Sequence, residues 1–376
     1  MLKIGVIGIG NAGNQVADLA HKSFGIKGIA LNSSEKDISN VRSVDGLVIG
    51  DEKGAGKDRN VAKKFIQGEA KALLNQEKFV NVIMDSDLIF VVSSTGGGTG
   101  SGMSPVFTDV LSRVYPMKKF ILIGILPPLK ESVAAQQNTI EYLKEINSGS
   151  STYMLYDNNN YTHETTDTMM KTVNQEIVED MLVIQGEYQM PTQYNSIDEK
   201  DMMKITQTYG RIVIARTAGM KEKDIDEKGI EERLVTVIKN NAHAELDRDQ
   251  IVKRLGLIVN LNEKLNKTLD SNLPTVKELI GEPIEGFEHI HLSEADGYTN
   301  RVIAIASGLS VPDDRITKII QRIDDVQEAL TKVKTSSVLD DTSVDILNEL
   351  RTTQETGGDV APKEVNLDDI FGSYIK

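Results

Sequence analysis

Residues 96–102 are Gly-Gly-Gly-Thr-Gly-Ser-Gly, and only Thr95 separates them from the apolar, strand-like run Leu-Ile-Phe-Val-Val-Ser-Ser at 88–94. Glycine carries no side chain, so the backbone of such a loop can approach a phosphate closely from several sides. The helix-like segment that follows would point its N-terminus at the same anion. Thr99 and Ser101 add hydroxyl donors. The loop therefore predicts a phosphate cradle between a strand and a helix, and it is not a Walker loop, because no Gly-Lys-Ser/Thr follows.

A second glycine loop lies near the start of the chain, where Gly8, Gly10 and Gly13 follow a short strand-like run. Taken alone, this spacing is typical of a dinucleotide loop and would indicate an NAD-dependent oxidoreductase. That fold calls for an acidic residue at the end of the second strand, where this chain has Asn32. The oxidoreductase alternative also leaves the loop at 96–102 unexplained.

The hydrophobic pattern predicts an α/β protein. Strand-like runs alternate with helix-length segments over the first 150 residues, which indicates a doubly wound, Rossmann-like domain with a parallel sheet. Apolar residues then recur at helical spacing between Asp167 and Gln185, so we expect one long central helix there. Strand-like runs at 211–219, 254–262 and 301–309 predict a smaller sheet in a second α/β domain.

The last part of the chain differs in composition. An apolar stripe after Pro312 predicts C-terminal helices, and from about Gln354 glycine, proline and acidic residues predict a disordered tail that ends in an apolar cluster. The expected divisions are a first domain at 1–165, the central helix at 166–186, a second domain at 187–311, C-terminal helices at 312–353 and a flexible tail at 354–376.

Composition excludes several function classes. The 376 residues carry a net charge of -14, which disfavours direct, sequence-independent binding to nucleic acid. The chain has no cysteine, which excludes disulfides and thiolate metal sites and fits a reducing cytoplasm. The longest apolar run, at 121–129, is far too short to span a membrane, so we expect no membrane insertion.

The loop at 96–102 resembles the signature loop of the tubulin and FtsZ superfamily, and the order of the other segments resembles that family over roughly residues 1–330. The resemblance implies a GTP-binding first domain, an activation domain second, head-to-tail polymerisation, GTP hydrolysis to GDP, and Mg²⁺ with the nucleotide. The residues it implies for nucleotide binding are Gly10, Asn11 and Asn14 in the first loop, Asn32 after the second strand, Gly54, Ala55 and Gly56 in a third loop, Gly96, Gly97, Gly98, Thr99, Gly100, Ser101 and Gly102 in the signature loop, Glu131 at the ribose, and Asn158 and Asn174 at guanine.

Hydrolysis also needs a group that positions and polarises the attacking water. In this family the next subunit supplies it, and the matching residues are Asp198 and Asp201, which would act in trans. On sequence grounds alone, an Asp-x-x-Asp pair at a helix start more often caps the helix. Asn195 lies three residues before Asp198, where the usual FtsZ spacing is two.

Within the superfamily, the long C-terminal helices and the short tail resemble the TubZ family of plasmid and phage tubulins. That resemblance implies a filament that segregates DNA by capturing a DNA-bound adaptor of the TubR type through the C-terminal tail. The alternatives are an FtsZ-type cell-division GTPase and a non-catalytic filament scaffold, and intact Asp198 and Asp201 argue against the scaffold. No metal-ligating residues are assigned, because His289 and His291 have no evident third ligand.

Overall fold

The computed structural model describes residues 1–148, 151–217, 219–221, 241, 243–246, 251–265, 283–295 and 297–336. Residues 1–317 form one compact unit, and the described residues from 318 onward belong to a second. The predicted tail at 354–376 and the part of the predicted C-terminal helices beyond 336 lie outside the described residues. The predicted domain boundaries stay predictions.

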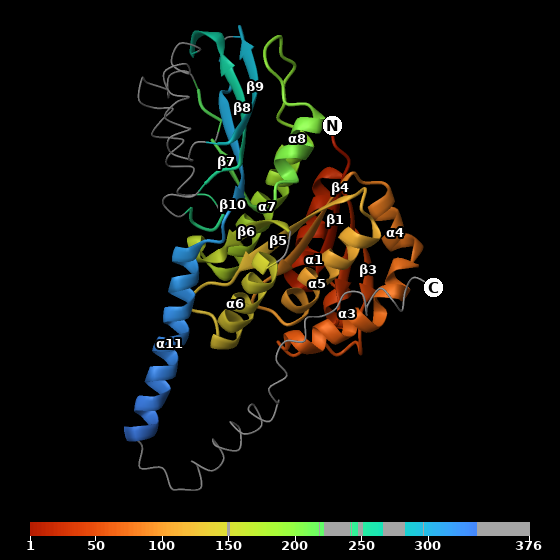
Figure 1. Ribbon diagram of the computed structural model, residues 1–376, viewed down its shortest axis with the longest axis vertical. Helices are drawn as coiled ribbons and strands as arrows, with labels where there is room; N and C mark the ends of the chain where they lie inside the picture. The colour runs from red at the N-terminus through yellow and green to blue at the C-terminus, as the bar shows by residue number, and fades with distance from the viewer. Residues whose placement is uncertain are drawn as a thin grey trace. The chain divides into compact units, whose positions relative to one another are not determined.

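The first unit is built on one mixed sheet of ten described strands in the order β3-β2-β1-β4-β5-β6-β7-β10-β8-β9 (Figure 1). Neighbouring strands from β3 to β7 are parallel, β10 runs antiparallel to β7 and β8, and β9 is parallel to β8. The strands are β1 (Ile4–Ile9), β2 (Lys27–Asn32), β3 (Asp45–Val48), β4 (Leu88–Ser94), β5 (Lys119–Leu126), β6 (Thr152–Asp157), β7 (Gly210–Arg216), β8 (Arg254–Asn262), β9 (Glu285–Ser293) and β10 (Arg301–Leu309).

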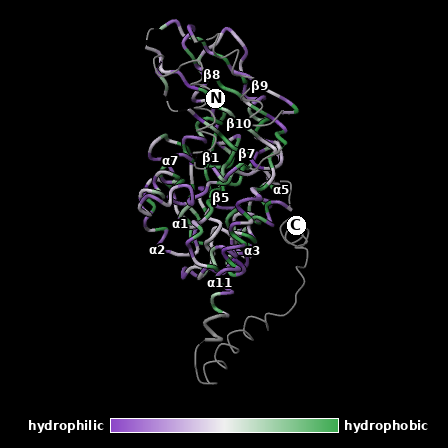
Figure 2. Tube along the Cα trace, turned by 90° about the vertical axis from the view of Figure 1, so that its left-hand side faces the viewer, coloured by the Kyte–Doolittle hydropathy of each residue, from purple (hydrophilic) through white to green (hydrophobic). Residues whose placement is uncertain are grey.

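The predicted parallel α/β architecture is confirmed. Strands β4 and β5 are buried along almost their whole length, as expected of parallel strands that helices cover on both faces. Figure 2 shows hydrophobic segments concentrated along the strands in the interior. The strands that the sequence predicts in a separate smaller sheet do not form one. They extend the sheet of the first domain, since Thr152–Met154 of β6 pair with Gly210–Ile212 of β7.

Helices fill the segments between the strands. The central helix predicted between Asp167 and Gln185 is confirmed as α7, whose N-cap Thr165 accepts from the Thr168 amide and which ends at Gly186 in the left-handed region. None of the described helices is long and apolar enough to cross a membrane. The described helices are α1 (Gly10–Phe24), α2 (Glu35–Ile38), α3 (Arg59–Leu74), α4 (Glu77–Met84), α5 (Thr99–Val114), α6 (Val133–Ser148), α7 (Thr166–Gln185), α8 (Glu199–Thr206), α11 (Asp313–Ser336) and the 3-10 turns η1 (Asn158–Tyr161) and η3 (Glu263–Leu265).

Candidate functional site

A cavity of about 380 Å³ lies where the parallel strands end, a common ligand position in open α/β sheets. It is lined by residues from β1, β2, β4, β5, η1, α1, α2, α5 and α7 and from the loops before α5 and α6. Ten of the predicted nucleotide-binding residues line it, namely Gly10, Asn11, Asn32, Gly97, Gly98, Thr99, Gly100, Glu131, Asn158 and Asn174. The structure thus brings the ends of distant segments together in one place.

Two helix N-termini meet at this cavity. Helix α1 begins at Gly10 and α5 at Thr99, and both residues line the cavity. Among the described residues, neither helix has a side-chain cap or an acidic residue in its first turn, whereas Asp58 caps α3 and Thr165 caps α7. Their backbone N–H groups and positive dipole ends are therefore available to an anion.

Glycine is required at two of these positions. Gly10 has a φ of +75°, and a Cβ there would lie 3.1 Å from the Gly100 nitrogen. A Cβ at Gly98 would lie 2.8 Å from the Cα of Lys57. By contrast, a Cβ at Gly97 would meet no described heavy atom within 4 Å, so that side of the loop is open space. The backbone is therefore closely packed at Gly10 and Gly98, whereas the space beside Gly97, next to the N-terminus of α5, is open.

The third predicted loop supports the cavity without lining it. The Gly54 amide donates to the Ser33 carbonyl at 2.8 Å, and the Asp58 amide donates to the Ala55 carbonyl at 2.8 Å. Gly56 adopts a positive φ of 57°. Because Ser33 follows the cavity residue Asn32, this loop is fixed to the end of β2.

Three residues of the signature loop also lie behind the lining. A Cβ at Gly96 would contact Pro127 and Ala135, and one at Gly102 would lie 2.5 Å from the Arg59 carbonyl. The hydroxyl of Ser101 is turned back onto its own helix, where it donates to the Gly97 carbonyl. These residues hold the backbone of the loop in place.

Asn14 is buried behind the first loop, with only 1% of its surface exposed. With its amide nitrogen facing the neighbouring carbonyls, that nitrogen lies 2.9 Å from the Gly8 oxygen and 3.1 Å from the oxygens of Gly10 and Leu31. Its amide oxygen then accepts from Asn32 at 3.3 Å. Asn14 therefore joins β1 to β2 and orients Asn32, which lines the cavity.

Amide side chains gather on another wall. Asn174 of α7 donates to Gln15 at 3.5 Å, and Gln15 donates to Asn11 at 3.4 Å. The side-chain oxygen of Asn158 is buried and has no hydrogen-bond partner among the described residues. Met170 lies one helical turn before Asn174 and supplies apolar surface. This wall offers both donors and acceptors to a planar polar ring.

The base of this wall is held by a buried ion pair. The Arg315 guanidinium donates to the Asp157 carboxylate at 2.5 and 3.1 Å and to the Pro127 carbonyl at 2.7 Å. Asp157 directly precedes Asn158, and Pro127 lies a few residues before Glu131. Arg315 thus joins two segments that contribute to the cavity.

Gln15 and Asp37 line the cavity but were missed from the sequence. Gln15 lies four residues after Asn11 on α1, so helical spacing could have placed it on the same face. Asp37 accepts from the Asn32 side chain at 3.4 Å, and its amide is bound by Ser34, the cap of α2. No regular spacing links Asp37 to the glycine loops, so its position depends on the fold.

Asp198 and Asp201 do not line the cavity of their own chain. They form a capping box at the start of α8, where the Asp201 amide donates to Asp198 at 2.8 Å and the Asp198 amide donates to Asp201 at 3.4 Å. The Asp198 side chain is exposed at the helix end. The structure therefore gives both residues a capping role, and their role toward a second subunit stays a prediction.

No metal-binding group of three or more His, Cys, Asp or Glu residues occurs in the part of the chain that the structure describes. The His289 ring lies 2.8 Å from the Met190 carbonyl oxygen, and the His291 ring lies 2.6 Å from that of Pro191. Burial lowers the pKa of His289. Both imidazoles fasten the 190–191 loop to the edge strand β9.

Comparison with known proteins gives a consistent result. Residues 3–165 match the family model described as Tubulin/FtsZ family, GTPase domain. The tubulin-like protein TubZ of Clostridium botulinum C phage is 24% identical over 406 aligned positions, which cover 98% of this chain and 98% of that protein.

Two solved structures share the fold. The crystal structure of Clostridium botulinum phage c-st TubZ has a TM-score of 0.68 at 20% identity and covers 87% of this chain and 99% of its own. The GTPγS-form protofilament of Bacillus thuringiensis serovar israelensis TubZ has a TM-score of 0.69 at 17% identity and covers 89% and 94%. The match at residues 3–165 includes both glycine loops, so it replaces the oxidoreductase alternative. Over residues 3–165, the chain therefore matches the GTPase domain of the Tubulin/FtsZ family.

Proposed function

We propose that this protein binds GTP in the cavity, hydrolyses it to GDP and phosphate, and polymerises head to tail. The observation that carries the proposal is the meeting of two uncapped helix N-termini, at Gly10 and Thr99, in one cavity that also has an amide-lined wall. Helix N-termini favour phosphates, and side-chain amides suit a purine with donors and acceptors on one edge.

Guanine is the base that fits the amide wall. Its ring edge offers N–H donors beside a carbonyl acceptor, and the buried, unpartnered oxygen of Asn158 needs a donor. Asn174 supplies a second amide, which Gln15 holds in place. Adenine presents a different order of donors and acceptors, so we expect selectivity for guanine.

Mg²⁺ fits the charge of this cavity. Of the described residues that line it, none is Lys, Arg or His, whereas Asp37 and Glu131 are acidic. The residues that would hold the ion are Asp37 and Thr99, whose oxygen atoms are the ligands that Mg²⁺ prefers together with substrate phosphates. When bound, Mg²⁺ would neutralise charge on the phosphates as they separate.

The first test measures which nucleotide binds. We expect GTP to bind more tightly than ATP. We also expect removal of Mg²⁺ with EDTA to lower the affinity for GTP. Asn158→Ala or Asn174→Ala should lower the affinity for GTP about tenfold, because each substitution removes about one hydrogen bond to the base. Neither substitution should change the affinity for ATP appreciably. Titration calorimetry gives these affinities, and Asn40→Ala, at an exposed site outside the cavity, is the control. Equal affinities for GTP and ATP in the wild type would contradict the assignment of guanine.

We further propose that the filament moves DNA rather than divides a cell. The full-length similarity to a phage TubZ supports this, as does the acidic charge, which calls for an adaptor between the filament and DNA. The proposed attachment point is the C-terminal tail at 354–376, which lies outside the described residues.

Deletion of residues 354–376 should leave GTP binding and polymerisation intact and abolish capture of a DNA-bound adaptor of the TubR type. Co-sedimentation of filaments with adaptor and labelled DNA measures this, and full-length protein is the reference. Unchanged capture by the truncated protein would place the adaptor site on the filament body. If the full-length filament captures no adaptor, the cell-division alternative gains support.

A further inference from the structure

Two irregular loops meet beside the cavity. One runs from Gly54 to Asp58 before α3, and the other includes Gly96 and Gly98 before α5. A Cβ at Gly98 would lie 2.8 Å from Lys57, so their backbones are in contact. Lys57 also has a φ of 66°, in the left-handed region that side chains disfavour. Such a conformation persists only where surrounding contacts hold it.

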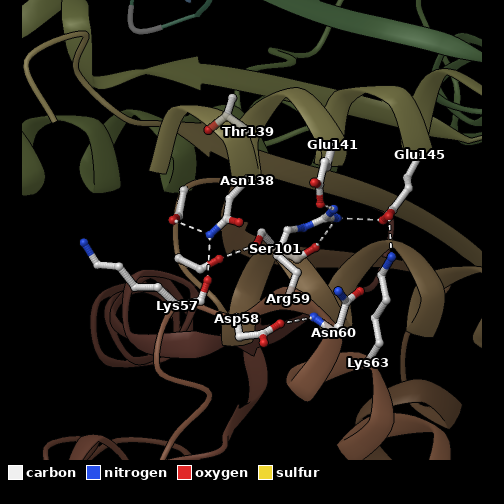
Figure 3. Close-up of polar contacts among 12 residues, drawn as sticks. Lys57, Asp58, Arg59, Asn60, Lys63, Ser101, Asn138, Thr139, Glu141 and Glu145 are labelled. Atoms are coloured by element: carbon white, nitrogen blue, oxygen red, sulfur yellow. Dashed lines mark hydrogen bonds and ion pairs between the residues drawn. The ribbon is translucent and has the colours of Figure 1, made fainter. Parts of the chain in front are cut away.

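Asn138 of α6 supplies the contact that both loops share. Its side-chain nitrogen donates to the Lys57 carbonyl at 3.0 Å and to the Gly96 carbonyl at 3.1 Å. An asparagine amide has two hydrogens, and here one serves each loop (Figure 3). A single side chain thus sets the distance between two backbone segments that lie far apart in the sequence.

The same face of α6 anchors the helices that follow these loops. Asn138, Glu141 and Glu145 are spaced three and four residues apart, so they share one helix face. Arg59, with a side chain only 2% exposed, binds Glu141 at 2.9 Å and Glu145 at 2.7 Å. It also donates to the Ser101 carbonyl at 2.9 Å, in the first turn of α5.

This anchoring makes α6 a rigid base for Asn138. Arg59 is the first residue of α3, so α6 is tied to the starts of both α3 and α5. The Arg59 guanidinium is itself buried, so losing its partners would leave a buried charge unpaired, which makes the arrangement costly to distort. The loops that precede α3 and α5 can therefore vary their separation only if the Asn138 contacts change.

We propose that Asn138 is a positioning residue that holds these two loops at the separation required by a nucleoside triphosphate. The inference rests on the proposed binding of GTP in this cavity. Asn11 belongs to the amide network with Gln15 and Asn174 that would contact the base, whereas Gly98 abuts Lys57 at the junction held by Asn138. The phosphate farthest from the base would lie at this junction, and a diphosphate lacks it. Asn138 thus contributes more to binding of the triphosphate than of the diphosphate.

Asn138→Ala tests this. We expect affinity for GTPγS to fall about tenfold and affinity for GDP to fall less than about threefold, because two hydrogen bonds to the loops are lost. Asn138→Asp places a carboxylate opposite two carbonyl oxygens and should lower the affinity for GTPγS further. Gln137→Ala, at an exposed neighbouring position on α6, should change neither affinity. Calorimetric titrations of each variant with both nucleotides give the comparison.

Equal weakening of GTPγS and GDP by Asn138→Ala, or no weakening, would overturn the inference while leaving the proposed function in place. Wild-type protein that binds neither nucleotide would overturn both. A second measurement needs no variant. In hydrogen–deuterium exchange of the wild type, GTPγS should protect peptides spanning 54–60 and 96–102 together and more than GDP does, and protection of only one of them would contradict a shared contact.

Discussion

Replacing Asp198 by Asn is expected to slow GTP hydrolysis at least about a hundredfold while GTP binding and the fold of α8 are kept. A carboxylate that orients and polarises the attacking water contributes about 10²–10⁴-fold to such a rate. Asparagine caps a helix as well as aspartate does, so the substitution removes the charge and retains the cap that Asp198 provides to the Asp201 amide. It therefore separates the capping role seen in the structure from the proposed catalytic role.

Asp201→Asn should have a similar effect, because the hydrogen bond that the Asp201 side chain makes among the described residues is to the Asp198 backbone amide. Glu199→Gln, an exposed change within the same turn, is the matched control and should leave turnover unchanged. Phosphate release at saturating GTP gives the rate, and electron microscopy shows whether filaments persist after GTP is added. Full turnover by both Asp→Asn variants would remove these residues from the mechanism.

The catalytic role proposed for Asp198 and Asp201 predicts that specific activity depends on protein concentration. Because Asp198 and Asp201 lie outside the cavity of their own chain, a single subunit would bind GTP without the proposed catalytic carboxylates. Specific activity should therefore rise steeply once subunits associate. Activity per subunit that is constant from the lowest concentrations would show that one chain suffices.

Much of the site could be predicted because it is built where buried strands end. Asn32 ends β2, Gly97 and Thr99 follow β4, and Asn158 follows β6, so correctly predicted strands place all of them at one edge of the sheet. The apolar runs of parallel strands are strong signals, since both faces are buried. The central helix carrying Asn174 was equally clear from its periodicity.

The rest depended on packing between segments far apart in the sequence. Asn138 acts through two carbonyl groups more than 40 residues away, and no motif surrounds it. Asp37 reaches the cavity only because α2 folds back beside β2. Asn14 was expected at the nucleotide, but burial turned its amide toward the backbone of β1 and β2. The strand pairing of β6 with β7 likewise could not be inferred from either strand alone.

A second large effect is expected at a buried cluster under α7, the helix that carries Asn174. The Asp180 carboxylate is 2% exposed. It accepts hydrogen bonds from Arg216 at 2.6 Å and from Tyr156 at 2.8 Å, and it lies 2.9 Å from the His243 ring nitrogen Nε2. These contacts join the central helix to β6 and β7. Removing one partner of a buried ion pair leaves an uncompensated charge, which typically costs about 3–5 kcal/mol.

The pKa of Asp180 determines how this cluster responds to pH. Burial raises that pKa, but Arg216, His243 and Tyr156 together lower it below the usual value of 3.8. In the wild type the cluster's contribution to stability is therefore complete above about pH 4 and is lost as pH falls through the lowered pKa. Without Arg216, the largest contribution that lowers this pKa is lost while burial still raises it, so we expect the pKa of Asp180 to rise and the folded protein to bind a proton there at higher pH than the wild type does.

Arg216→Met should thus lower the free energy of unfolding by about 3–5 kcal/mol at pH 7, and by less at pH 5, because protonation of Asp180 relieves the buried charge. Urea unfolding followed by circular dichroism at both pH values measures this. Lys171→Met, which breaks an exposed ion pair with Asp167 on the same helix, is the control and should have little effect. Adding Asp180→Asn to Arg216→Met should restore part of the lost stability, since no unpaired charge then remains buried. Equal effects of Arg216→Met and Lys171→Met at pH 7 would mean that this buried pair does not hold α7 against β7.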